Sequence, residues 1–249
     1  MEILKYKKMA NGCYKIDITG YGDIQLHEET ILKYELLLKR NITSILIQEI
    51  IDFDKTWDVY YAGLKLLKAR FRSTKELKEL LIRKEYPTNL VNDTIDKLIE
   101  QGYLDDRSFA RGYINNQILT SSRGPLRIKK ELLNKGVSID IVNDEISAFT
   151  SDLQIEKIDK IIRIALKSNR NRGGNVLKNK IINDLVSSGY DISLINKVIS
   201  NYEFNNNFEI AKKEYEKLLK KYERKYSGRE LDYKIREKLY QKGLSYDEN

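Results

Sequence analysis

The chain has 249 residues, of which 41% are hydrophobic and 33% are charged. This length is enough for one large or two ordinary domains, and the apolar content is enough to bury a core, which argues against disorder. With only 13 glycines and 2 prolines to interrupt helices, the composition favours an all-α fold. The single cysteine, Cys13, can form neither an internal disulfide nor a thiolate metal site, so we expect a cytoplasmic protein. No apolar run is long enough to cross a bilayer and none follows the N-terminal lysines, so we expect neither membrane insertion nor secretion.

The net charge of +8 is concentrated in the middle of the chain. Residues 111–180 hold 14 Lys and Arg against 7 Asp and Glu, whereas residues 1–110 balance at 18 against 18 and residues 181–249 at 13 against 12. A local excess of this kind is expected of a protein that binds a polyanion, because each neutralised phosphate releases condensed counterions. The alternative is an ordinary solvated helix surface.

The first predicted element is a β-hairpin, because apolar and polar residues alternate over residues 13–26 on both sides of the turn at residues 20–23. From Glu28 onward the apolar period becomes that of helices. One predicted apolar stripe comprises Ile31, Tyr34, Leu37 and Leu38, and the next comprises Ile45, Leu46 and Ile50. We therefore assign residues 1–27 to an N-terminal β-hairpin and residues 28–54 to a helical lead-in.

Internal repetition appears when the helix ends are aligned on their glycines. The segments LLNKGV (132–137), LVSSGY (185–190) and LYQKGL (239–244) superimpose, and Glu85 stands at the glycine position of an earlier copy, which gives a period of about 50 residues. Two core positions recur in each copy: Leu77, Ile128, Ile181 and Ile235 at the first, and Leu81, Leu132, Leu185 and Leu239 at the second. The triplet Val-Asn-Asp at 91–93 and 142–144 marks the helix that follows.

Each repeat is predicted to contain three helices, which in the first repeat lie at about residues 57–70, 73–84 and 88–101. The repeats span residues 55–104, 105–151 and 152–204, and a partial C-terminal repeat spans 205–249. Glycine just past a helix supplies a left-handed cap, so these glycines need no functional explanation. Because stacked repeats contact mainly their neighbours, we predict tandem three-helix repeats in an elongated, curved array.

Two candidate metal or catalytic features have simpler structural explanations. Asp105 and Asp106 form a carboxylate pair that a metal-dependent nuclease could use. However, Asp106 stands directly before a predicted helix, where an acidic side chain caps free N–H groups. His27, the only histidine, has no second histidine or cysteine nearby, so we predict a structural role for it and no metal site.

The basic residues of the middle segment have helical spacing. Arg123, Arg127 and Lys130 are predicted to point to one side of a helix that starts at Pro125, away from its core residues, and the spacing recurs in the third repeat. The predicted contact ridge for a partner or nucleic acid comprises Arg123, Arg127, Lys129, Lys130, Arg163, Lys167, Arg170 and Arg172. Charge that only keeps the protein in solution is the alternative. The 17 tyrosines could stack on bases, but packing is favoured because Tyr190 falls where Val137 and Leu244 fall.

The sequence holds no phosphate-binding or dinucleotide-binding glycine loop, and a nucleophile triad would have to use His27. We therefore predict that the protein is not an enzyme and that it has no catalytic residue and no cofactor.

Three motifs resemble those of the RecX family. They are R-x-R-S-x-x-E-L at residues 70–77, G-Y-L-D-D-x-x-F-A at 102–110 and G-P-x-x-I-x-x-E-L-x-x-K-G at 124–136. The resemblance covers residues 57–150 well and the remaining helical part mainly through its period. The third repeat departs from the pattern, because it has Arg172-Gly173-Gly174-Asn175 and no Gly-Pro helix start.

The resemblance implies a regulatory protein that binds the RecA recombinase and its single-stranded DNA filament within the SOS response and DNA recombination. Such a protein lies in the filament groove and inhibits or modulates filament growth, ATP hydrolysis, strand exchange and coprotease activity. The implied partners are the RecA filament and single-stranded DNA, with duplex DNA as a further candidate, no membrane, and a monomeric chain. The alternative is a stand-alone DNA-binding protein that uses its repeats like helix-turn-helix readers.

Overall fold

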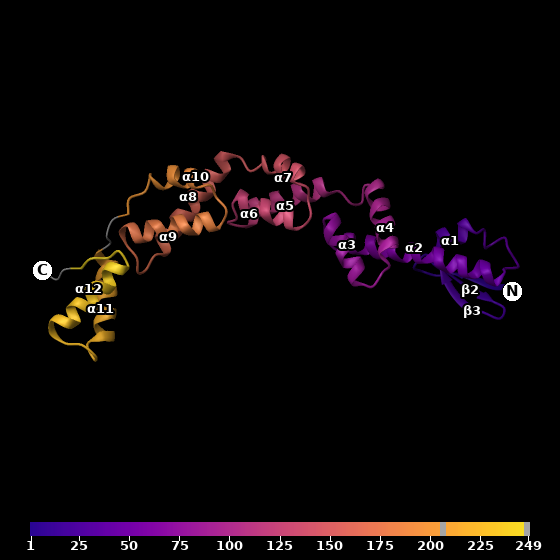
Figure 1. Ribbon diagram of the computed structural model, residues 1–249, viewed down its shortest axis with the longest axis horizontal. Helices are drawn as coiled ribbons and strands as arrows, with labels where there is room; N and C mark the ends of the chain where they lie inside the picture. Colours follow the sequence, from indigo (N-terminus) through magenta and orange to yellow (C-terminus); the bar gives the residue numbers. More distant parts are fainter. Residues whose placement is uncertain (205–207, 247–249) are drawn as a thin grey trace. The chain divides into compact units, whose positions relative to one another are not determined.

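The structure, a computed structural model, describes residues 1–204 and 208–246. Its only sheet among these residues has three antiparallel strands in the order β1 (Ile3–Lys8), β2 (Tyr14–Ile18) and β3 (Gly22–Leu26) (Figure 1). Strands β2 and β3 form the predicted hairpin. Strand β1 was not predicted, because five of its six residues are exposed and its pairing with β2 shifts register between Ile3 and Lys5, so it shows little apolar alternation.

Twelve helices follow among the described residues, which confirms the predicted, mainly helical class. The helices are α1 (Glu28–Lys33), α2 (Ser44–Ala69), α3 (Thr74–Arg83), α4 (Thr88–Glu100), α5 (Asp106–Thr120), α6 (Pro125–Asn134), α7 (Ile139–Ile146), α8 (Ser151–Ser168), α9 (Gly174–Ser187), α10 (Ile192–Ile199), α11 (Phe208–Tyr222) and α12 (Gly228–Gln241). The expected start of the partial repeat, at 205–207, and the end of the chain, at 247–249, lie outside the described residues. None of the described helices combines the length and the apolar character needed to span a membrane.

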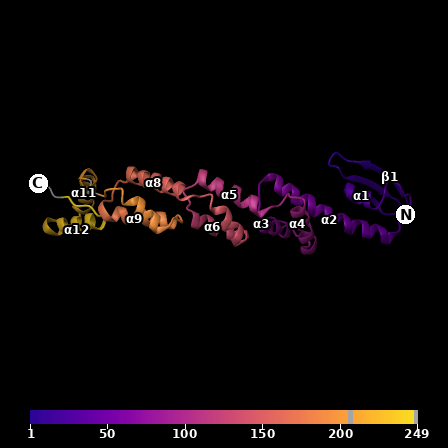
Figure 2. The same ribbon diagram turned by 90° about the horizontal axis from the view of Figure 1, so that it is seen from above.

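The chain divides into two compact units. The first comprises Met1–Phe109 with Lys135–Val137, and the second comprises Ala110–Asn134 with Ser138–Asn249. In the first unit, the sheet and α1 lie over one end of α2 (Figure 2), where Ile16, Leu26, Ile47 and Ile50 share a core. The other half of α2 contributes Val59 and Tyr60 to a second core with α3 and α4. The expected boundary at residue 54 therefore falls inside one continuous helix.

The apolar stripes expected at residues 31–50 are partly wrong. Leu38 and Ile45 are each 82% exposed, whereas Leu36 and Ile47 are buried. The reason is that α1 ends at Lys33 and the chain turns before α2 begins, so a single helical period does not run through this segment.

The recurring core positions of the repeats are confirmed. All eight predicted positions are at most 2% exposed, and so are Val137 and Tyr190, with their equivalent Leu244 at 3%. Val91 and Val142, the first residues of the recurring triplet, are fully buried at equivalent places on α4 and α7. Glu85 adopts φ 66°, close to the values of 83°, 93° and 68° at the three aligned glycines. The glycine alignment therefore found a repeated backbone conformation as well as a repeated sequence.

The same glycines also make close contacts between consecutive repeats. In the second unit, the C-terminal end of α9 meets the start of α6: Gly124 N–H donates to the Ser188 carbonyl at 2.7 Å, and Leu126 N–H donates to the Gly189 carbonyl at 3.0 Å. A Cβ atom on Gly189 would lie 2.5 Å from the Arg127 nitrogen, and one on Gly124 would overlap the Gly189 backbone. Neither position has room for a side chain.

Equivalent junctions occur at two other places. Gly173, at the start of α9, donates its N–H to the Lys242 carbonyl at 2.9 Å, next to Gly243. In the first unit Ser73, the N-cap of α3, donates its hydroxyl to the Lys135 carbonyl at 2.6 Å, next to Gly136. The Lys135 ammonium lies 2.7 Å from Glu76 Oε1. The two junctions of the second unit thus each join the start of the second helix of one repeat to the end of the second helix of the next, and Ser73 makes the equivalent contact with Lys135 inside the first unit.

We predict that Gly124→Ala lowers the free energy of unfolding by roughly 1–3 kcal/mol, because the new methyl group overlaps backbone that cannot rotate away. Gly112→Ala is the matched control, since Gly112 lies inside α5 with nothing within 4 Å of the added atom. That change should stabilise the helix by about 0.5–1 kcal/mol. Urea unfolding followed by far-ultraviolet circular dichroism measures both, and similar shifts for the two variants would contradict a tight junction.

Candidate functional site

The two arginines of the second repeat in the predicted ridge form ion pairs with the same carboxylate. The side chain of Arg123, just before α6, and that of Arg127 lie 3.3 and 3.2 Å from the same oxygen, Glu131 Oε1. Arg123 also donates to Gln117 Oε1 at 2.7 Å, and Tyr113 donates its hydroxyl to Glu131 Oε2 at 2.7 Å. These two arginines are therefore held in place by neighbours that offset part of their charge.

The two lysines of α6 differ from each other. Lys129 donates to Asn143 Oδ1 on α7 at 2.9 Å and so helps to hold these helices together. Lys130 is exposed, and within the described part of the chain no carboxylate lies within ion-pair distance of it. Lys130 is thus the α6 residue whose charge is most available to a partner.

In the third repeat, too, some ridge residues have polar partners within the protein and others do not. Arg163 lies 2.8 Å from Asp159 Oδ2 and donates to the Tyr202 hydroxyl at 3.2 Å. Arg170 donates to the carbonyls of Lys167 and Asn169 at the end of α8. For Lys167 and Arg172, the described residues supply no ion-pair partner.

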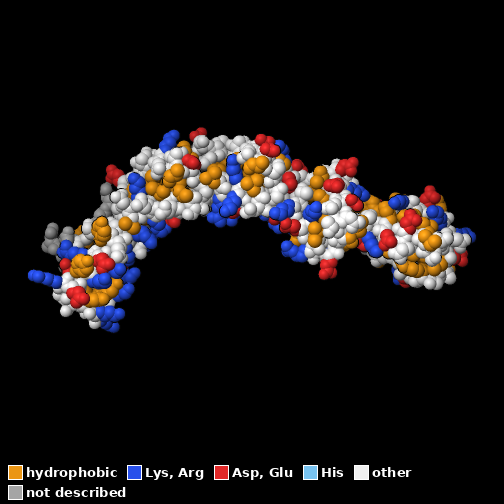
Figure 3. Space-filling model, viewed as in Figure 1, with side chains coloured by type: hydrophobic (Ala, Val, Ile, Leu, Met, Phe, Trp, Pro, Cys, Tyr) orange, Lys and Arg blue, Asp and Glu red, His pale blue; other side chains and the backbone are white. Residues whose placement is uncertain are grey.

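A shallow hollow of about 290 Å³ lies at the turn between α8 and α9, lined by Arg170, Arg172, Lys180 and apolar residues of α9. Lys180 pairs with Asp184, one turn further along α9. Within the second unit, Figure 3 shows Lys and Arg side chains gathered along the edge at which α6 and α9 lie in Figure 1. The structure thus leaves Lys130, Lys167 and Arg172 as the predicted ridge residues with the most available charge.

The carboxylate pair of the second motif caps two different helices. Asp105, and not Asp106 as we expected, is the residue that caps α5: its carboxylate accepts from the N–H groups of Arg107 and Ser108 at 2.9 and 3.2 Å. Hydrogen bonds from Ser108 hold the pKa of Asp105 below its usual range. Asp106, in the first turn of α5, instead accepts from the N–H of Thr74, the first residue of α3, at 2.8 Å. Both carboxylates are engaged in ways that a nuclease metal centre would have to disrupt.

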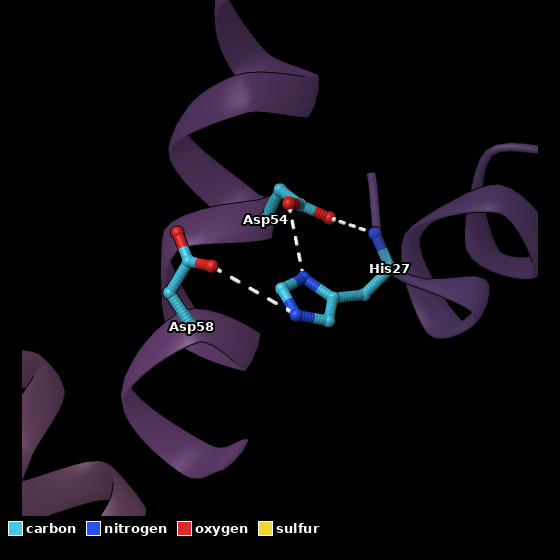
Figure 4. A group of neighbouring side chains, drawn as sticks. All are labelled: His27, Asp54 and Asp58. Carbon is cyan, nitrogen blue, oxygen red and sulfur yellow. Dashed lines mark hydrogen bonds and ion pairs between the residues drawn. The ribbon is translucent and has the colours of Figure 1, made fainter. Parts of the chain in front are cut away.

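His27 belongs to a cluster that the sequence reasoning missed. Its Nδ1 lies 3.1 Å from Asp54 Oδ2 and its Nε2 lies 3.8 Å from Asp58 Oδ1 (Figure 4). Its ring also stacks on that of Tyr61, with 5.1 Å between the ring centroids. Asp54 and Asp58 are one turn apart on α2, a spacing that could have pointed to a shared partner. Burial raises the pKa of Asp58, against the opposing effect of the His27 ring.

One ligand atom from each of His27, Asp54 and Asp58 lies within 4.8 Å of the others, so the three could in principle hold a metal ion. The contacts favour a structural role instead. The other oxygen of Asp54 accepts from His27 N–H at 2.8 Å and from the Thr30 hydroxyl at 2.5 Å. The side chain of His27, the N-cap residue of α1, makes no capping hydrogen bond. Asp54 therefore caps the start of α1 in its place. The predicted structural role of His27 stays a prediction, which this geometry supports.

Together these observations define a class: a helical repeat protein with an N-terminal sheet, repeats joined by glycine contacts, and a cationic surface on its second unit. Two models of the RecX family match the chain. The first three-helix domain of RecX matches residues 60–98, and the second three-helix domain of RecX matches residues 105–144.

Relatives match over nearly the whole chain. The regulatory protein RecX of Listeria innocua is 29% identical over 94% of this chain and 88% of its own length, and that of Lactococcus lactis is 27% identical over 99% and 95%. A crystal structure of a regulatory protein RecX has a TM-score of 0.71 at 22% identity, covering 80% of this chain and 98% of its own. RecX from Lactobacillus salivarius has a TM-score of 0.55 at 27% identity, covering 59% and 96%. The chain belongs to the RecX family of regulatory proteins.

We predict that Asp54→Ala lowers the free energy of unfolding by about 1–3 kcal/mol, because it leaves the buried Thr30 hydroxyl and the His27 N–H without their acceptor. Asp52→Ala is the matched control on the same helix: its side chain is 55% exposed, and its loss should cost at most about 0.5 kcal/mol. Urea unfolding followed by the fluorescence of Trp57, also on α2, measures both. Equal midpoints for the two variants would show that Asp54 does not cap α1.

Proposed function

We propose that this chain is a non-enzymatic, cytoplasmic regulator of the RecA recombinase. It binds the RecA filament on single-stranded DNA as a monomer and slows filament growth, ATP hydrolysis, strand exchange and assisted repressor cleavage. Membership of the RecX family supports the general role, and the recombinase as target is what the motif resemblance implies.

One observation supports the cationic surface of the second unit as the binding site. Within the described part of the second unit, Lys130, Lys167 and Arg172 have no carboxylate at ion-pair distance, although each lies on the same repeats as arginines that do. Lys130 and Lys167 are exposed and Arg172 is half-buried. Surface cations whose charge is not offset attract a polyanion such as the phosphate backbone, and their binding energy comes largely from counterion release. The paired residues Arg123, Arg127 and Arg163 shape the surface and contribute less charge to it.

The mechanism is multivalent clamping. Each exposed cation gains little when it acts alone. When several are fixed on consecutive repeats, the first contact places the others close to their targets, so that the later contacts become effectively intramolecular. A filament, which repeats its phosphates and its protein subunits at regular intervals, offers several such targets at once.

The test of the function is to titrate the protein into a RecA reaction and to follow single-strand-dependent ATP hydrolysis and filament length together. We expect hydrolysis to fall. Filaments that shorten as it falls indicate capping of their ends, and intact but inactive filaments indicate occupation of the groove. Undiminished hydrolysis together with tight, sequence-selective binding to duplex DNA alone would favour the stand-alone DNA-binding protein instead.

We predict that the triple variant Lys130→Glu, Lys167→Glu, Arg172→Glu weakens binding to the filament and reduces the slope of log affinity against log salt by about 1 for each phosphate that is no longer neutralised. The control is Lys39→Glu, Lys65→Glu, Lys68→Glu, which makes the same change of charge at exposed lysines of the first unit. Fluorescence anisotropy of labelled filaments across about 50–200 mM salt measures both. If the control bound as weakly as the triple variant, net charge and not the ridge would govern binding.

A further inference from the structure

An apolar groove of about 450 Å³ lies in the second unit, apart from the predicted ridge. The C-terminal end of α5 contributes Ile118 and Leu119, and α8 contributes Leu153, Ile161 and Ile164. Leu119 is 84% exposed, Ile164 is 57% exposed and Leu153 is 38% exposed. Aliphatic side chains that are exposed together in one groove make it a candidate interaction site.

Helix α8 has two apolar faces. Ile158 and Ile162 are fully buried in the protein core. Leu153, Ile161 and Ile164 lie at positions i, i+8 and i+11 and face the groove instead. A helix that packs against one core needs a single apolar stripe. The second stripe runs for about three helical turns, or roughly 16 Å, and within it Leu153 and Ile164 stay exposed.

Two lysines on the same face of α8 line this groove. Lys157 donates one hydrogen bond, to the Ser121 carbonyl at 2.7 Å, although an ammonium group has three donors. Neither Lys157 nor Lys160 has a carboxylate at ion-pair distance within the described residues, and Glu156 is the one acidic side chain of the lining. Burial lowers the pKa of Lys157, the charge of Lys160 lowers it further, and Glu156 opposes the change. A carboxylate brought to this place would meet two ammonium groups that the fold leaves without one.

We propose that this groove binds an acidic amphipathic helix of a protein partner, about three turns long, whose aliphatic side chains fill the groove and whose carboxylates meet Lys157 and Lys160. The inference deepens the proposed function and rests on it for the partner: the groove holds the protein component of the filament, and the ridge faces its nucleic acid. Helix-in-groove binding of this kind uses anchors at helical spacing, which the stripe on α8 matches.

Nucleic acid fits the groove less well. Single strands bind where bases stack on aromatic side chains and phosphates meet cations. The lining of this groove includes no aromatic residue, and a sugar-phosphate backbone would leave Leu119 and Ile164 facing a charged chain. Aliphatic side chains combined with two lysines that have no carboxylate partner fit a protein segment that carries both leucine-like and acidic residues.

The probe is a capped peptide of leucine, alanine and glutamate, about 14 residues long, with its leucines at positions i, i+4, i+7 and i+11. The full chain carries labelled isoleucine methyl groups, and the signals of Ile118, Ile161 and Ile164 are followed during titration. We expect the acidic peptide to shift these signals and a version with lysine in place of glutamate not to do so. Equal binding of both peptides, or shifts confined to other isoleucines, would overturn the inference.

The variant Leu119→Asp, Ile164→Asp should weaken binding of the peptide at least about tenfold, an effect typical of removing anchors at the centre of an interface. Leu38→Asp, Ile45→Asp is the control, because both residues are 82% exposed and lie in the first unit. Undiminished binding of the peptide to the groove variant would count against the site. So would a single-stranded oligothymidine that shifts the groove signals when the peptide does not.

The same variants in the RecA reaction separate the two proposals. A wild-type chain that binds the peptide in the groove but leaves RecA unaffected would refute the proposed function and leave the groove with another protein partner. A wild-type chain that inhibits RecA, together with a groove variant that inhibits equally well, would refute the groove as the contact to the recombinase. We expect inhibition by the groove variant to need at least about ten times more protein while its binding to bare single-stranded DNA is unchanged.

Discussion

The contact on which the repeats of the second unit depend is the close approach of backbone at their glycine junctions. The start of a helix leaves N–H groups without partners and the end of a helix leaves carbonyls without partners. At Gly124 and at Gly173 the start of one helix is paired directly with the end of another, and at Ser73 a hydroxyl makes the same link. Glycine at the end of the second helix allows both the positive φ and the short distance. One residue type thus caps a helix and joins two repeats.

The junctions also determine how the candidate surfaces are supported. Arg127 lies on the first turn of α6, where its backbone nitrogen faces Gly189, and Arg123 precedes the same turn. The shared carboxylate of Glu131 then fixes both guanidinium groups. Of the cations that remain without such partners, Lys130 and Lys167 project from helices whose ends are already held, whereas Arg172 lies in the turn between α8 and α9. A charge on a fixed helix loses less freedom on binding than a charge on a loop, which favours recognition by several weak contacts.

Sequence reasoning was most accurate where the structure is local and repeated. Alignment on the glycines located the buried positions of four copies, because burial follows the helical period and the period was intact. It missed β1, whose exposed residues carry no periodic signal, and it assigned the cap of α5 to the wrong aspartate, since helix ends are set by hydrogen bonds that patterns do not contain. The ridge could have been refined from sequence, because Glu131 and Asp159 lie four residues from Arg127 and Arg163, within reach on a helix.

The groove and the ridge together suggest how a regulator could tell a filament from its components. Exposed lysines alone bind any polyanion and lose affinity as salt screens them. An apolar groove three turns long binds one short helix, with an affinity limited by the cost of fixing it. When both lie on one compact unit, a target that offers phosphates and an acidic helix side by side is held by both, and the second contact forms at high effective concentration. Selectivity for the assembled filament then follows from the joint presence of two surfaces, each of which is weak and unselective by itself.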